Sequence, residues 1–208
     1  MPGQLVYLVE NDYRIQRMFE KKGWRITDNP EIADLIQFTG GSDVTPYYYG
    51  QEAHPTVQNN EERDEREAKF YTGLSNTTPK AGICRGGQFL HVMNEGSLFQ
   101  DVNNHAIFNT HPVYLMDGSK VQVTSTHHQV MKGLGMLPID IIGVAYESTR
   151  REWVEEGEII VENKKDFDYE ILFYGGTNSL CFQPHPEYGV KECEDLYFGL
   201  LSQCFGLM

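Results

Sequence analysis

One stretch carries the clearest structural signal in the chain: Lys80-Ala81-Gly82-Ile83-Cys84-Arg85-Gly86-Gly87-Gln88-Phe89-Leu90-His91. Glycines surround Cys84, and an amphipathic pattern begins a few residues later. This order predicts a strand, a sharp turn and a helix, with the thiol at the apex of a nucleophile elbow. Glycines let the strand and the helix approach closely, and the amino end of a helix favours a thiolate. The stretch therefore indicates a nucleophilic cysteine, and the alternative is a structural Cys in a glycine-rich turn.

Composition bounds the class of protein. The 208 residues are 40% hydrophobic and 23% charged, which suits one globular domain over residues 1–208. A net charge of −13 repels a phosphate backbone, so we expect no direct nucleic-acid binding. The sequence has no apolar run near the roughly 20 residues that span a bilayer, and no signal peptide is visible. Four scattered cysteines without metal-type spacing predict reduced thiols in a cytoplasmic protein.

The N-terminal third alternates between strand and helix patterns. Apolar runs predict strands at residues 4–9, 24–27 and 34–39. Asn11 or Asp12 can cap a helix that ends at Gly23. Short connections between such elements are typical of a doubly wound α/β fold, in which helices cover both faces of a mostly parallel sheet.

Residues 40–60 read as a long loop, and such loops are often functional. The charged stretch at residues 60–74 predicts a helix whose charges form a solvated face. We expect its apolar residues to face the core and Arg63 and Asp64 to form a surface ion pair; these apolar residues are Ala68, Phe70, Tyr71 and Leu74.

The second half of the chain is rich in strand patterns. Residues 96–102 lead into polar loops, and an Asp117-Gly118 turn predicts a hairpin. Strands are expected at residues 113–116, 120–124, 139–146, 159–161, 171–174 and 180–183. A C-terminal helix carrying Leu196, Phe198 and Leu200 closes the chain, with Cys193 and Cys204 on one buried face.

A nucleophilic thiol needs a base and a group that orients the base. His185-Pro186-Glu187 offers both, because residues i and i+2 of an extended segment share a face. The flanking prolines restrict the backbone there.

Several motifs together resemble class I glutamine amidotransferases. Gly82-Ile83-Cys84-Arg85-Gly86-Gly87-Gln88 is similar to their G-x-C-x-G-x-Q signature, and Gln183-Pro184-His185-Pro186-Glu187 to their terminal His-Pro-Glu motif. Further stretches resemble the γ-glutamyl-γ-aminobutyrate hydrolase branch, namely residues 40–46 with Tyr49-Gly50, Arg63-Asp64 with Glu67, residues 96–102, and Ser125-Thr126-His127-His128-Gln129. The order of the motifs is that of the family, whose fold is flavodoxin-like.

The resemblance implies roles for particular residues. Cys84 would attack the γ-carbonyl of glutamine or a γ-glutamyl conjugate and form a glutamyl thioester. His185 would be the base and acid, and Glu187 would orient it. Backbone N–H groups of Gly41 and Arg85 would form the oxyanion hole. The substrate would be bound by Gln88, His127, His128 and Gln129.

Two departures from the family pattern concern the elbow helix and the turn after it. His91-Val92 stands where relatives usually have Asn-Val, and Glu95-Gly96 stands where they have Gly-Gly. We expect these differences to affect helix packing and the rim of the pocket, and so the identity of the substrate.

Three functions remain open from the sequence. The first is a stand-alone γ-glutamyl hydrolase, and the second is a glutaminase that delivers ammonia to a separate synthetase partner. The third is a catalytically inactive binding module. No cofactor is expected. A zinc site from His54, His105 and His111 lacks ligand spacing, so no metal is expected either.

Overall fold

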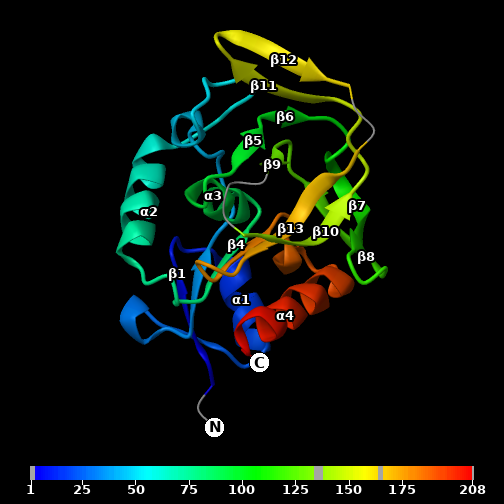
Figure 1. Cartoon of the computed structure of the whole chain (residues 1–208). Coiled ribbons are helices and arrows are strands. Elements are labelled where there is room, and N and C mark those ends of the chain that lie inside the picture. The colour runs from blue at the N-terminus through cyan, green and yellow to red at the C-terminus, as the bar shows by residue number, and fades with distance from the viewer. Residues whose placement is uncertain (1–2, 134–137, 164–165, 208) are drawn as a thin grey trace.

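The computed structural model describes residues 3–133, 138–163 and 166–207. In this part of the chain, four α-helices pack around a central sheet (Figure 1). They are α1 (Tyr13–Lys21), α2 (Glu61–Gly73), α3 (Arg85–Met93) and α4 (Lys191–Phe205). Short 3-10 helices form at Pro30–Ile32, Pro46–Tyr49 and Pro186–Tyr188.

One half of the eleven-stranded sheet is parallel, in the order β2-β1-β3-β4-β14. Its strands are β1 (Leu5–Leu8), β2 (Arg25–Ile26), β3 (Leu35–Phe38), β4 (Lys80–Ile83) and β14 (Ser179–Phe182). All five were predicted, β4 from the glycine-rich pattern around Cys84 and the others from their own short stretches. The carboxyl ends of β4 and β14 lie side by side, because Ile83 pairs with Phe182.

The other half of the sheet is antiparallel and continues from β14 in the order β13-β10-β7-β8, while β9 bridges β13 and β5. Its strands are β5 (Ser97–Phe99), β7 (Ala106–Leu115), β8 (Lys120–Thr126), β9 (Val130–Lys132), β10 (Asp140–Ala145) and β13 (Asp168–Tyr174). The sheet is thus mixed: the predicted parallel arrangement describes its first half.

A second sheet of three strands lies at the top of Figure 1. It consists of β6 (Asp101–Val102), β11 (Arg151–Glu155) and β12 (Glu158–Glu162). Residues 96–102 form β5 and β6, and the stretch after them, where polar loops were expected, forms β7 from Ala106 onward. Strand pairing across the chain supplies their backbone partners, and a short local pattern does not reveal such pairing.

Helices cover both faces of the parallel half. One core cluster joins Phe19 of α1 and Tyr197 of α4 to Leu35 of β3. The next residue, Ile36, points to the opposite cluster, where Phe89 of α3 packs. This alternation along β3 is what a strand between two helical layers requires. Cys193 is buried in the first cluster and Cys204 packs beside it, as expected for one helix face.

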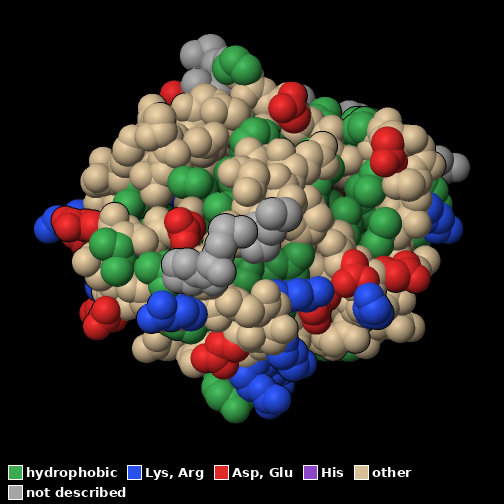
Figure 2. Space-filling model, turned by 90° about the horizontal axis from the view of Figure 1, so that it is seen from below, with side chains coloured by type: hydrophobic (Ala, Val, Ile, Leu, Met, Phe, Trp, Pro, Cys, Tyr) green, Lys and Arg blue, Asp and Glu red, His purple; other side chains and the backbone are tan. Residues whose placement is uncertain are grey.

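Charged side chains of both signs are interspersed on the face seen from below (Figure 2). In the described part of the chain, no helix has the length and apolar character needed to cross a membrane.

Candidate active site

Cys84 occupies the turn between β4 and α3. Its backbone has φ 52° and ψ −115°, a region that residues with a Cβ rarely adopt. The backbone N–H donates to the Phe182 carbonyl at 2.8 Å, which ties the turn to β14. The structure thus contains the predicted strand–turn–helix with the thiol at its apex, where only 9% of Cys84 is exposed.

The glycines around Cys84 are required by close packing. A Cβ on Gly82 would lie 2.2 Å from the Gly86 carbonyl oxygen, and one on Gly86 would lie 2.3 Å from that of Phe38. Backbone groups cannot move away as a flexible side chain can. The G-x-C-x-G spacing therefore serves the approach of α3 to β3 and β4.

His185 follows β14 and is fixed on three sides. Its Nδ1 lies 2.5 Å from Glu187 Oε1, and its backbone N–H donates to Thr124 Oγ1 at 2.6 Å. The Tyr188 ring stacks on the imidazole at 4.3 Å between centroids. The expected contact between His185 and Glu187 is present, although a 3-10 turn at Pro186–Tyr188 brings it about rather than an extended segment.

The charge state of His185 follows from its neighbours. Burial alone lowers its pKa, but the charge of Cys84, a hydrogen bond with Cys84 and the Glu187 carboxylate raise the pKa of His185 to about 11. At neutral pH the ring is then an imidazolium beside Cys84, a positive charge of the kind that activates cysteine nucleophiles.

Three glutamines line the inner side of the thiol. Gln183 places Nε2 3.8 Å from Cys84 Sγ. Gln88 donates from Nε2 to Gln183 Oε1 at 3.1 Å and to the Gln129 carbonyl at 2.9 Å. The amide group of the Gln129 side chain is buried without a hydrogen-bond partner among the described residues. Gln88 and Gln129 therefore meet beside Cys84.

The two histidines expected in the pocket point to different carboxylates. His127 is buried, with Nε2 3.3 Å from Glu170 Oε1. His128 is partly exposed, with Nε2 3.2 Å from Asp43 Oδ1. The three histidines considered for a zinc site, His54, His105 and His111, do not come together, because His54 contacts Glu152 at 3.1 Å.

The loop after β3 passes directly against the base. A Cβ on Gly40 would lie 3.0 Å from His185 Cε1. Gly41 has φ 141°, and a Cβ there would lie 2.3 Å from Arg63 Nη1. Arg63 donates to the carbonyl oxygens of Gly40 and Thr39, at 3.0 and 3.1 Å. The guanidinium of α2 thus holds the loop that carries Gly41.

A buried ion network connects this loop to the elbow. The Arg85 guanidinium, 1% exposed, contacts the carboxylates of Asp64 and Glu67. Glu67 also accepts from Arg63 Nε at 2.7 Å, and Asp64 accepts from the Thr45 N–H at 2.7 Å. The network joins α2, the first residue of α3 and the loop after β3.

The expected surface ion pair between Arg63 and Asp64 is wrong. Asp64 is 1% exposed and pairs with Arg85, whereas Arg63 pairs with Glu67. The physical reason is that an arginine buried in the elbow needs carboxylates, which α2 supplies. A signal was present in the sequence, because Asp64 and Glu67 share the helical face of Tyr71 at i, i+3 and i+7 spacing.

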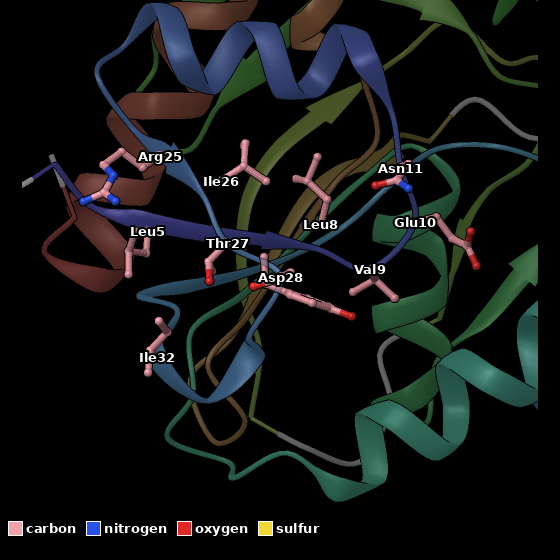
Figure 3. Close-up of a pocket in the computed structure, with 11 residues that line it drawn as sticks. Leu5, Leu8, Val9, Glu10, Asn11, Arg25, Ile26, Thr27, Asp28 and Ile32 are labelled. Atoms are coloured by element: carbon pink, nitrogen blue, oxygen red, sulfur yellow. The ribbon is translucent and has the colours of Figure 1, made fainter.

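A cavity of about 610 Å³ lies elsewhere, at the β2 edge of the sheet (Figure 3). Residues of β1, β2 and the turns after them line it, including Leu8, Glu10, Arg25 and Asp28. Cys84, His185 and Glu187 are not among its lining residues. We therefore assign the chemistry to the elbow and not to this cavity.

The chain is similar in sequence to known proteins. A family model described as Peptidase C26 matches residues 25–146, a range that includes Cys84. The "Putative glutamine amidotransferase-like protein YvdE" of Lactococcus lactis subsp. lactis is 33% identical over 161 residues. That alignment covers 75% of this chain and 66% of the relative, so the chain spans just under two thirds of its length.

Two solved structures have a similar fold at low sequence identity. A protein described as a putative GMP synthase subunit, from Thermoplasma acidophilum, has a TM-score of 0.67 at 14% identity, with 97% of this chain and 94% of that chain covered. A glutamine amidotransferase from Thermotoga maritima has a TM-score of 0.60 at 15% identity, with 98% and 85% covered. These neighbours confirm the predicted flavodoxin-like α/β class.

Proposed function

Because the chain belongs to the Peptidase C26 family, we propose that it is a cysteine hydrolase of a γ-glutamyl C–N bond, in glutamine or in a γ-glutamyl conjugate. The observation that carries the proposal is the strained thiol of Cys84 beside a buried His185–Glu187 pair. Glutamine amidotransferase-like relatives make the amide of a glutamyl group the substrate to test first.

The reaction proceeds through a thioester. The Cys84 thiolate attacks the γ-carbonyl carbon, and the C–N bond breaks as His185 gives its proton to the leaving nitrogen. Neutral His185 then takes a proton from water, which attacks the thioester. Glutamate leaves, and the thiolate–imidazolium pair is restored. Glu187 keeps the imidazole in one orientation and stabilises its charge.

The negative oxygen of each tetrahedral intermediate needs donors. We assign these to the backbone N–H groups of Arg85 and Gly41. The Arg85 N–H lies at the amino end of α3, where the helix dipole favours negative charge. The arginine network that joins Arg63 and Arg85 supports this assignment, because it fixes the backbone on both sides of the thiol.

We assign recognition of the glutamyl group to the glutamine side chains near Cys84. The candidates are the unpartnered amide of Gln129 and the Gln88 side chain, which donates to the Gln129 carbonyl and to Gln183 beside the thiol. His127 and His128 were expected to share it, but the His127 ring is buried against Glu170 and is left out of this assignment. The contact of His128 with Asp43, which follows the Gly41 loop, supports a place for His128 at the rim.

A second candidate is a glutaminase that passes ammonia to a separate synthetase. It is favoured by the likeness in fold to the protein described as a putative GMP synthase subunit. In this version the thioester chemistry is the same, and the synthetase is a partner protein.

One experiment tests both versions. Purified wild type and Cys84→Ala are incubated with L-glutamine and with a γ-glutamyl amine, and released ammonia, amine and glutamate are measured. We expect Cys84-dependent release from at least one substrate, and release from the amine conjugate alone supports the stand-alone hydrolase.

An electrophilic glutamine analogue is then added to a protein that releases nothing. A gain in mass at Cys84 supports a glutaminase that needs its partner. Neither release nor labelling at Cys84 would contradict both versions and favour a binding module.

A further inference from the structure

Three histidines converge on one buried carboxylate outside the thiol site. His105 directly precedes β7, His111 lies on β7, His127 follows β8, and Glu170 lies on β13. None of these four side chains is more than 3% exposed. The ring centroids of His105 and His127 are 4.6 Å apart, and that of His111 lies 4.9 Å from His105.

The polar atoms of this histidine cluster lack hydrogen bonds, although ring nitrogens of all three histidines lie 3.3–3.5 Å from Glu170 Oε1. Within the described residues, no hydrogen-bond partner exists for either ring nitrogen of His111 or His127, for Nδ1 of His105, or for either oxygen of Glu170. Buried polar atoms are nearly always paired, because leaving one unpaired costs about 1–3 kcal/mol. These seven atoms belong to three rings and the carboxylate that they surround, which indicates a missing shared partner.

The geometry points to a cation as that partner. Ring nitrogens of His105, His111 and His127 lie 3.5, 3.4 and 3.3 Å from Glu170 Oε1. Ligands held by one tetrahedral zinc ion at about 2.0–2.1 Å lie about 3.3 Å from one another. The ligand atoms of His105, His127 and Glu170 all fall within 4.8 Å of each other, so they need to close by at most about 1.5 Å around an ion of this size.

The surroundings of His105 match those of a metal ligand. Its Nε2 contacts Asp168 Oδ2 at 2.9 Å, which leaves Nδ1 directed at Glu170. Asp168 is itself held by Ser148 Oγ at 2.6 Å and Arg151 Nε at 2.9 Å. A carboxylate behind a histidine ligand fixes the ring and its tautomer, and such support is characteristic of metal sites.

We propose that His105, His127 and Glu170, with His111 as the fourth ligand, bind one divalent transition-metal ion of the zinc class. Imidazole with a carboxylate suits Zn²⁺ and Co²⁺, and four protein ligands make a closed, structural site. The site is separate from the proposed reaction and does not depend on it. The metal clamps the β7–β8 hairpin to β13, whose Glu170 carbonyl accepts from the Gln183 N–H next to the thiol.

The test uses the whole chain carrying Cys84→Ala, so that the thiol and His185 cannot act as an alternative metal site. The protein is unfolded in denaturant with a chelator and refolded with Co²⁺ or Zn²⁺, because the rings are buried. We expect one metal per chain, visible cobalt absorption bands typical of tetrahedral nitrogen and oxygen ligands, and a higher melting temperature with Zn²⁺.

Variants of the same protein locate the ion. His127→Gln and Glu170→Gln should each weaken metal binding at least tenfold, and Asp168→Asn should weaken it about 10- to 100-fold. His54→Gln is the matched control, since His54 is also buried against a carboxylate, and it should keep the bands.

Two results would overturn the proposal. The refolded Cys84→Ala protein could show native circular dichroism but neither metal nor cobalt bands, which would mean that protons alone satisfy the cluster. Bands that persist in both His127→Gln and Glu170→Gln would place the ion elsewhere. The first result needs no variant of the cluster, so a folding failure of those variants leaves the test intact.

Discussion

The Cys84 thiol differs from the other three cysteines in the charge beside it. Burial raises the pKa of Cys193 to about 12 and that of Cys204 to about 11, and it also raises the pKa of Cys181. These three thiols stay protonated at neutral pH. Cys84 instead faces His185, whose pKa of about 11 keeps the ring positively charged.

We therefore predict that iodoacetamide alkylates Cys84 first and that His185→Gln slows this reaction at pH 7 by about 10- to 100-fold. In the wild type the rate should stay nearly constant from pH 6 to 9, because His185 remains protonated below its raised pKa. In His185→Gln the rate should climb with pH, as an ordinary thiol ionises near pH 8.5. Mass spectrometry of labelled peptides measures both, with Cys84→Ala as the control. Equal rates at pH 7 would contradict the ion pair.

Glu95 explains one departure from the family pattern at the residue scale. It has φ 67°, a left-handed conformation that favours glycine, and relatives usually have glycine there. Gly96 is needed for another reason, since a Cβ there would lie 2.2 Å from Nε2 of His91. His91 in turn contacts the Tyr174 hydroxyl at 2.7 Å, so both departures concern packing around α3.

Glu95→Gly should raise the free energy of unfolding by about 1 kcal/mol, because it removes the strained Cβ. Urea denaturation provides the measurement. Glu95→Ala keeps the Cβ and should leave stability near the wild-type value, and an equal gain in both variants would show that the charge and not the backbone matters.

At the scale of elements, the contact between α3 and β3 sets the position of the elbow. Gly86→Ala would place a Cβ against the Phe38 backbone, so we expect a loss of at least about 3 kcal/mol or failure to fold. Gly199→Ala is the matched helix control, because nothing lies within 4 Å of its added Cβ. It should stabilise α4 by about 0.5–1 kcal/mol. Thermal unfolding of the pair decides whether close approach or helix propensity governs these glycines.

The buried ion pairs between α2 and Arg85 can be tested by their effect on stability. Asp64→Asn leaves Arg85 short of one of its two carboxylates in a buried setting, so we expect a loss of about 3 kcal/mol. Arg66→Ala removes an exposed ion pair with Glu10 from the same helix and should leave stability unchanged. Denaturant midpoints compare the two. A change below about 1 kcal/mol in Asp64→Asn would show that Glu67 alone neutralises Arg85.

Local sequence patterns were sufficient to predict elements that form regular alternations of strand and helix or that depend on residues a few positions away. The strands of the parallel half, the Asp12-capped α1 and the elbow follow from apolar runs, capping chemistry and glycine spacing. They were insufficient for α2. The charge of Asp64 predicted an exposed side chain, but Asp64 is buried because it pairs with Arg85, 21 residues away. The partner of a buried charge cannot be read from the helix that carries it.

For the whole molecule, the arrangement of the parallel half was predictable, whereas in the antiparallel half several strands were predicted but their place in the sheet was not. Strand β11 was not predicted; it pairs with β12, which follows it directly, and with β6, some 50 residues earlier. The histidine cluster was not predicted either, since His105, His127 and Glu170 show no ligand spacing along the chain. Only the sheet order brings β7, β8 and β13 together.

The pairing of β4 with β14 has a consequence for how the protein folds. Cys84 and Gln183 are 99 residues apart, yet the strands that precede them are neighbours, and the strands of the antiparallel half lie between them in the sequence. Contacts of such long range form slowly compared with helices. During refolding, helical circular dichroism should therefore return before fast alkylation of Cys84 does. The thiol can thus report when the last long-range strand pair has formed, and simultaneous recovery of both signals would contradict this order of events.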